Sequence, residues 1–299
     1  MKKAIFIVGP TATGKTGLAV KIHKKIPSIL VSADSVQVFK GADIVSGKDL
    51  DVLFDAKIVL IDEVDPTDDF SINDFKRIAE DAIKKAIAEN KIPIVIGGTG
   101  YYFDSLFSSI DTLGVKPNKE LRNKLENKSI EELTNELEKI NPKKFSGLNN
   151  SDLNNKRRLI RAIEVSSLGG IKNSNPIFTK DEVLFIGLKM NRQNLVEKIR
   201  ERVENRIKNG AIEEVKELFR SYKKLSSQLK SSNGYKQLFS HLNNEIDFEE
   251  AKERWLIADR QHAKKQVTWF RRNPDINWFD VENIDFENQV FDLIDKSFF

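Results

Sequence analysis

The chain has 299 residues, of which 39% are hydrophobic and 31% are charged, as in a globular protein with one large or two modest domains. It contains no cysteine, which excludes disulfides, thiolate zinc sites and a cysteine nucleophile and fits a cytoplasmic protein. The formal net charge is only +4, and no apolar run approaches the length of a membrane span, so we expect no membrane partner.

The first element is the apolar run Ala4–Val8, which predicts a buried strand. It leads directly into eight residues with the pattern G-x-x-x-x-G-K-T: Gly9, Pro10, Thr11, Ala12, Thr13, Gly14, Lys15 and Thr16. A strand, a glycine turn and a helix N-terminus form a cradle whose backbone N–H groups bind phosphate. Lys15 supplies a cation to the terminal phosphate, and the Thr16 hydroxyl is suited to bind Mg²⁺. A kinase, a nucleotide hydrolase and an enzyme that expels diphosphate all fit this pattern.

Apolar runs later in the chain predict further strands. They lie at 28–32, 57–61, 92–96, 183–188 and 276–279. Helical spacing of apolar residues fills the stretch between the third and fourth strands. Continuous apolar strands separated by helices are typical of a parallel sheet that is covered on both faces.

The middle of the chain is rich in Lys, Glu and Asn, and its leucine spacing predicts a small helical insertion. Long helices are expected after the fifth strand and again over 248–272, where Pro274 follows the end. We therefore predict an α/β fold with a phosphate-loop parallel sheet covered by helices, a helical insertion and long C-terminal helices. The core comprises 1–112 and about 151–299, and the insertion about 113–150.

Polar residues follow several of these strands, at the edge where parallel sheets bind ligands. Asp34, after the second strand, is a candidate general base or metal ligand, although an Asp-Ser pair also commonly caps a turn. Thr99 offers a hydroxyl after the fourth strand, where a plain strand-to-helix turn fits equally well. Asp62 and Glu63 end the third strand as the acids of a nucleotide hydrolase do, and an ordinary loop is the alternative.

Two segments concentrate positive charge. Residues 139–161 contain seven basic residues and one acid, and residues 254–272 contain six basic residues and one acid. In the second segment, Arg260 and Lys264 lie one helical turn apart and Trp269 follows, a combination that suits nucleic acid. Solvated helix faces and core aromatic residues are the alternative interpretation.

Over residues 6–272 the chain resembles the tRNA dimethylallyltransferase family. The matching blocks, in order, are residues 9–16, 34–39, 60–62 with 65–66, 70–71 and Phe75, 97–102, 158–165, 234–237 and 260–271. Their shared order and spacing carry the resemblance. The chain departs from the family pattern in three places, with Phe39-Lys40 for Tyr-Arg, Val45-Ser46-Gly47-Lys48 for Gly-Thr-Ala-Lys, and Lys265 for Arg.

The resemblance implies transfer of a dimethylallyl group from its diphosphate to the exocyclic amine of the adenosine 3′ of the anticodon, with release of diphosphate. Asp34 would take a proton from the amine, and Thr99 would line the channel where the substrates meet. Residues 9–16 and Arg161 would hold the diphosphate, with Mg²⁺ at Thr16. The resemblance also implies tRNA contacts at Asp34, Ser35, Val36, Gln37, Thr99, Arg122, Arg157, Arg158, Arg161, Gly234, Tyr235, Lys236, Gln237, Arg260 and Lys264.

The expected partners are therefore the tRNA anticodon stem-loop and dimethylallyl diphosphate, with Mg²⁺ as cofactor, and we expect a monomer. A small-molecule kinase with the same loop and a non-enzymatic RNA-binding module are the rival functions. Adenosine nucleotides are an alternative acceptor, and the basic segments favour tRNA.

Overall fold

The computed structural model describes residues 2–48, 56–107, 115, 118–167 and 176–299. The chain forms two compact units. The first comprises Met1–Phe107 and Ile177–Phe299, and the second comprises Ser108–Pro176. None of the helices in these described ranges is long and apolar enough to cross a membrane.

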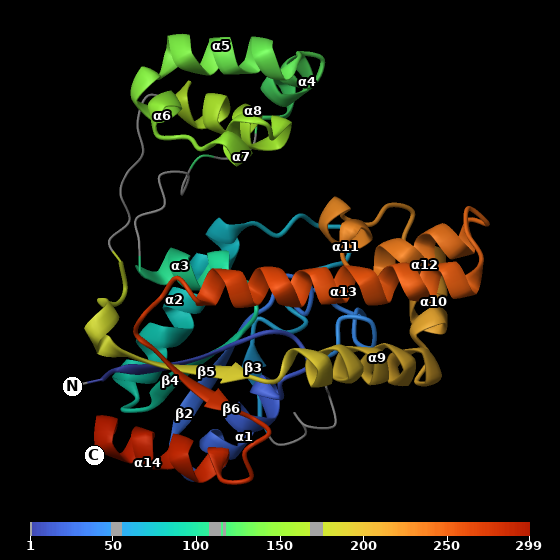
Figure 1. Ribbon diagram of the computed structural model, residues 1–299. Helices are drawn as coiled ribbons and strands as arrows, with labels where there is room; N and C mark the ends of the chain where they lie inside the picture. The colour runs from blue at the N-terminus through green and yellow to red at the C-terminus, as the bar shows by residue number, and fades with distance from the viewer. Residues whose placement is uncertain (1, 49–55, 108–114, 116–117, 168–175) are drawn as a thin grey trace. The chain divides into compact units, whose positions relative to one another are not determined.

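The first unit is built on a sheet in which every neighbouring pair of strands is parallel (Figure 1). Its strands are β1 (Ala4–Val8), β2 (Ser28–Ala33), β3 (Ile58–Val59), β4 (Ile92–Gly97), β5 (Val183–Lys189) and β6 (Ile276–Asp280). Their order across the sheet is β3-β2-β4-β1-β5-β6. The register pairs Ile7 with Ile96, and Gly97 with Ala33, so that β1, β4 and β2 end at nearly the same level.

Helices cover both faces of the sheet, which confirms the predicted α/β fold. Those of the first unit are α1 (Lys15–Lys25), α2 (Ile72–Ala88), α3 (Gly100–Phe107), α9 (Arg192–Lys208), α10 (Ala211–Ser221), α11 (Ser227–Ser231), α12 (Tyr235–Leu242), α13 (Phe248–Phe270) and α14 (Phe286–Phe298). In Figure 1, α1 and α14 lie on one face of the sheet, whereas α2, α3 and α13 lie on the other.

The alternation of side chains along β1 divides the core between these two faces. Phe6 and Val8 point into the cluster beneath α2, α3 and α13. There the ring centroids of Phe6 and Phe103 lie 5.4 Å apart. Ile5 and Ile7 point into the cluster beneath α1 and α14. Both faces of the central strand are fully buried, which is why its sequence is a continuous apolar run.

The third strand is shorter than predicted. The apolar run 57–61 predicts a strand along its whole length, but β3 ends at Val59. Leu60 (φ 70°) and Asp62 (φ 57°) adopt left-handed backbone conformations, which turn the chain away from the sheet. The run stays apolar because Leu60 is buried in the core.

The second unit is helical and has a small core of its own. Its helices are α4 (Lys119–Glu126), α5 (Ile130–Ile140), α6 (Pro142–Ser146), α7 (Asn150–Leu153) and α8 (Lys156–Ser166). Leucines of α4 and α5 pack on apolar residues of α8 such as Leu159 and Ile163. The fully buried carboxylate of Glu164 accepts hydrogen bonds from Arg122 (2.8 Å), Arg161 (2.5 Å) and the backbone N–H of Asn118 (2.5 Å).

Burial by itself raises the pKa of Glu164, but the hydrogen bonds from Arg122, Arg161 and Asn118 outweigh it, and the net pKa is lower than the ordinary 4.5. We predict that Glu164→Gln destabilises the second unit by about 3 kcal/mol at neutral pH, because two arginines lose their shared anion. The carboxylate contributes this stability above pH 4.5, and the contribution is lost as the pH falls through the lowered native pKa.

Hydrogen exchange in peptides covering α5 and α8 measures this effect, with the exposed Glu138→Gln as the control. The difference between Glu164→Gln and the unsubstituted protein should be large at pH 7 and should narrow below pH 4.5. Equal protection of Glu164→Gln and the unsubstituted protein at pH 7 would contradict a stabilising role of the Glu164 carboxylate.

Candidate active site

The phosphate loop connects β1 to α1 through backbone conformations that glycine adopts easily. Gly14 lies in the left-handed region (φ 78°), and Gly9 (φ 141°) packs on β5 so closely that a Cβ would lie 2.5 Å from the carbonyl oxygen of Leu188. No side chain caps the start of α1. Its first N–H groups therefore have no side-chain acceptor at the cap position, which makes this terminus suited to an anion.

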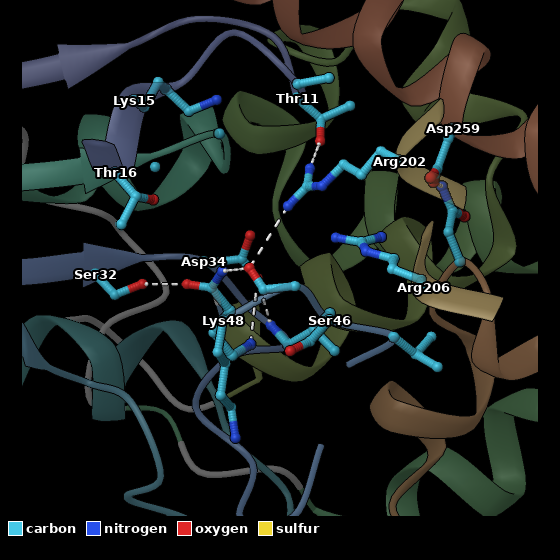
Figure 2. Close-up of a pocket in the computed structure, with 18 of the residues that line it drawn as sticks. Thr11, Lys15, Thr16, Ser32, Asp34, Ser46, Lys48, Arg202, Arg206 and Asp259 are labelled. Atoms are coloured by element: carbon cyan, nitrogen blue, oxygen red, sulfur yellow. Dashed lines mark hydrogen bonds between the residues drawn. The ribbon is translucent and has the colours of Figure 1, made fainter. Parts of the chain in front are cut away.

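A cavity of about 1050 Å³ adjoins this loop. Figure 2 shows Lys15 and Thr16 on one side of it, Arg202 and Arg206 on the other, and Asp34 between them. Thr99 also lines the cavity. The structure thus brings the predicted phosphate cradle together with both predicted catalytic residues, all from the first unit.

Inside the loop, two side chains hold the carbonyl oxygen of Pro10. The Lys15 ammonium donates to it at 2.6 Å and the Thr13 hydroxyl at 2.9 Å. These bonds hold the loop in a closed turn. Lys15 lies in the cavity wall. Thr16 lines the same wall and offers a hydroxyl oxygen there.

Asp34 follows directly on β2 and lines the cavity. Its Oδ1 accepts hydrogen bonds from the backbone N–H groups of Val36 (2.8 Å) and Gln37 (3.3 Å). The two interpretations of Asp34 are therefore compatible, because the side chain caps the turn and also reaches the cavity. The turn fixes the direction of the carboxylate.

Gln266 of α13 joins two walls of the cavity. Its side-chain oxygen accepts from the backbone N–H of Thr11 (2.8 Å), and its side-chain nitrogen donates to the carbonyl of Gly98 (3.1 Å). A Cβ on Gly98 would overlap that side-chain nitrogen, so a larger residue there would displace the Gln266 amide. Beside it, the N–H of Thr99 donates to the carbonyl of Ala33 (3.3 Å), which fixes the Thr99 turn against the end of β2.

The sequence analysis missed the basic side chains that α9 contributes to the cavity. They are Lys198, Arg202 and Arg206. Arg202 donates to the hydroxyl of Thr11, so it touches the phosphate loop directly. The signal was present in the sequence, since positions 198, 202 and 206 follow one another at four-residue intervals on one helix face. Nothing local shows that this face turns toward the loop.

His262 of α13 also lines the cavity. Its side chain is exposed to solvent, and the desolvation that it still undergoes in the cavity wall lowers its pKa. Asp34 and Asp259 oppose the change by favouring the charged imidazolium, whereas Lys15 and Lys265 reinforce it. The site therefore favours neutral His262 near neutral pH.

Comparison with known proteins now decides the family. The model of the IPP transferase family matches residues 37–273, and that of the isopentenyl transferase family matches residues 2–62. The chain belongs to the IPP transferase family.

Similar members of this family include a tRNA dimethylallyltransferase of Finegoldia magna, 37% identical over 94% of this chain and 92% of its own length. The crystal structure of the full-length tRNA isopentenylpyrophosphate transferase of Bacillus halodurans matches with a TM-score of 0.73 at 30% identity, over 99% of this chain and 97% of that one. A eukaryotic dimethylallyltransferase, described in crystallographic snapshots as acting on tRNA, matches with a TM-score of 0.82 at 26% identity, over 100% and 79% of the two chains.

In this IPP transferase, Asp62, which follows the turn after β3, is bound to a buried lysine. Asp62 forms an ion pair with the buried ammonium of Lys48 at 2.5 Å. Lys48 also donates to Asp43 (2.6 Å) and to the carbonyl of Phe39 (2.7 Å). Among the described residues that line the cavity, neither Asp62 nor Glu63 is present. The cluster fixes the loop that follows Asp34.

Three of the predicted arginines of the second unit, at 122, 158 and 161, have partners within that unit. Arg161 donates to Glu164 and to the carbonyl of Val115 (2.8 Å), and Arg158 pairs with Asp152 (2.6 Å). Arg122 is half-buried on Glu164, and Arg157 is exposed. Their contacts with diphosphate or tRNA stay predictions.

The predicted tRNA contacts in the first unit have varied surroundings. Tyr235 is fully buried, and its hydroxyl donates to Glu214 at 2.7 Å. Lys236 and Lys264 are exposed, whereas Arg260 is half-buried and its buried Nε has no hydrogen-bond partner among the described residues. These contacts also stay predictions.

We predict that Gln266→Ala lowers the affinity for inorganic diphosphate about tenfold, because the N–H of Thr11 loses its acceptor and the loop loses its tie to Gly98. Calorimetric titration with inorganic diphosphate and Mg²⁺ measures the affinity. The exposed Gln261→Ala on the same helix is the matched control. If Gln266→Ala and Gln261→Ala bind diphosphate equally, the bridge does not order the loop.

Proposed function

We propose that this chain transfers a dimethylallyl group from dimethylallyl diphosphate to the exocyclic amine of the adenosine 3′ of the anticodon in tRNA, releasing diphosphate. The observation that carries the proposal is the position of Asp34 in the same cavity as Lys15 and the phosphate loop. Family membership and the names of similar proteins, which are tRNA dimethylallyltransferases, support the same reaction.

The reaction needs two kinds of charge stabilisation. As the bond between the prenyl carbon and the diphosphate oxygen breaks, negative charge grows on the departing diphosphate. The N–H groups of the loop, Lys15 and Arg202 are suited to receive it, since Arg202 contacts Thr11 from the opposite wall. Arg161 remains a further proposed ligand of the diphosphate.

The amine must lose a proton as its nitrogen bonds to the prenyl carbon, because it would otherwise carry a positive charge. Asp34 is the proposed base, and the hydrogen bonds of Val36 and Gln37 hold its carboxylate in one orientation. Thr99, on the neighbouring turn, is proposed to line the meeting point of amine and donor.

The cavity wall also suits Mg²⁺. Among the described residues there is no cluster of three or more carboxylate, histidine or cysteine ligands, so a metal here would take few protein oxygens. This is the usual arrangement for Mg²⁺, which keeps water and substrate phosphate oxygens as most of its ligands. The Thr16 hydroxyl is the proposed protein ligand. When bound, Mg²⁺ would neutralise part of the diphosphate charge.

The acceptor adenine must leave its stack to reach a cavity inside the protein, which costs a few kcal/mol. Residues 34–37 are proposed to contact the extruded base and its neighbours. The exposed Lys236 and Lys264, together with Arg260, are proposed to hold the phosphate backbone. Arginines of the second unit at 122, 157, 158 and 161 are proposed as further tRNA contacts.

Direct assay of the transfer tests this function. The protein is incubated with unmodified tRNA, Mg²⁺ and labelled dimethylallyl diphosphate, and the labelled nucleoside is mapped. Label on the adenosine 3′ of the anticodon supports the proposal. Label on free adenosine nucleotides alone, or phosphate transfer from ATP in place of prenyl transfer, would contradict it.

We predict that Asp34→Asn lowers kcat at least about 100-fold, because the amide keeps the turn but takes up no proton. The affinity for tRNA should stay within about tenfold, since the lost interaction belongs to the transition state. Single-turnover transfer and filter binding measure the two quantities, with the exposed Asp69→Asn as control. Parallel losses of binding and turnover would exclude the role of base.

We also predict that tRNA affinity falls about 100-fold between roughly 50 and 200 mM salt, because basic side chains release counterions from the phosphates. Lys264→Gln should reduce the slope of log affinity against log salt by about one, whereas Lys296→Gln on α14 should leave it unchanged. An affinity that does not change with salt would contradict the proposal that basic side chains bind the phosphate backbone of tRNA.

A further inference from the structure

Two arginines of α9 have neighbouring guanidinium groups in the cavity. A Cβ on Gly47 would lie 2.5 Å from the terminal nitrogen of Arg202 and still closer to that of Arg206. Both nitrogens therefore lie around one point, and they occupy the space that a side chain at position 47 would fill. Figure 2 shows both side chains entering the cavity from the same wall, opposite Lys15 and Thr16.

Two contacts fix the position of Arg202, and a third set fixes the loop that contains Gly47. Arg202 is joined to the hydroxyl of Thr11 and to the carbonyl of Gly47 (3.5 Å). Gly47 itself has a left-handed backbone (φ 68°). Its loop is anchored by Glu214, whose carboxylate accepts from the N–H groups of Asp43 (2.9 Å) and Val45 (3.1 Å). The position of Gly47, against which the two arginines lie, is therefore set by contacts of the loop that also contains Lys48.

We propose that Arg206, seated against Gly47, is a second arginine ligand of the donor diphosphate, beside Arg202. The proposal rests on the proposed function and deepens it. An anion with several oxygens can bond to two adjacent guanidinium groups at once, because each guanidinium presents several N–H donors. A diphosphate on the phosphate loop is such an anion, and Arg202 contacts that loop directly. Glycine at position 47 is what leaves room for the second arginine.

Arg206→Gln tests the proposal, with Arg200→Gln as the matched control on the exposed face of the same helix. Calorimetry with inorganic diphosphate and Mg²⁺ should show binding at least about tenfold weaker for Arg206→Gln and unchanged for Arg200→Gln. The KM for dimethylallyl diphosphate should rise by a similar factor, with tRNA affinity within about twofold. Unchanged diphosphate binding, or a loss confined to tRNA binding, would overturn the proposal.

Gly47→Ala tests whether glycine at position 47 is what allows Arg206 its place in the cavity. The added methyl should displace Arg206 and weaken diphosphate binding, and it should weaken binding much less when Arg206→Gln is already present. The backbone strain of alanine at a positive φ is common to both backgrounds and cancels in this comparison. Equal losses in the two backgrounds would show that Gly47 does not act through Arg206. That result would contradict the claim that glycine at position 47 leaves room for this arginine.

These measurements separate the two proposals. Diphosphate binding that depends on Arg206 in a protein that transfers no prenyl group to tRNA would reject the proposed function and keep the arginine pair. Prenyl transfer to tRNA that is indifferent to Arg206→Gln would keep the function and reject the pair.

Discussion

The parallel pairing of β1, β4 and β2 is the constraint on which the site depends. Since parallel strands share one direction, their carboxyl ends meet at one edge of the sheet. The phosphate loop leaves β1 there, Thr99 follows β4 and Asp34 follows β2. Three short turns from distant parts of the sequence thus form one wall. A shift of one residue in either pairing would turn these side chains toward the opposite face.

Charge is distributed over this wall in a way that suits a prenyl transfer. Cations stand at the loop and on α9, where Lys15 and Arg202 approach the expected diphosphate from two sides. The Asp34 carboxylate, held by its own turn, faces the same cavity. In the proposed reaction, the cationic region would stabilise the departing diphosphate while Asp34 would accept the proton. The two tasks need opposite charges within one cavity, and separate elements of the sheet edge supply them.

Local patterns predicted the parts of this site that are contiguous in the sequence. The apolar run before Gly9 and the glycine spacing within the loop are enough to predict a strand, a turn and a helix start. The contacts that complete the site depend on tertiary distance. Gln266 reaches Thr11 across 255 positions, and Arg202 reaches it across 191. No local periodicity records such approaches, so the arginines of α9 were visible only as one face of a polar helix. The early end of β3 could not be predicted for a similar reason. An apolar residue such as Leu60 is buried whether it lies in a strand or in a turn, so the sequence pattern does not distinguish the two.

The most direct test is a crystal structure of the protein with a tRNA anticodon stem-loop and a donor analogue that cannot transfer its prenyl group. The account predicts the diphosphate on the loop of residues 9–16 and the exocyclic amine within about 3.2 Å of an Asp34 carboxylate oxygen, with the prenyl carbon on the far side of the amine. A diphosphate bound away from that loop, or an amine beyond the reach of Asp34, would contradict it.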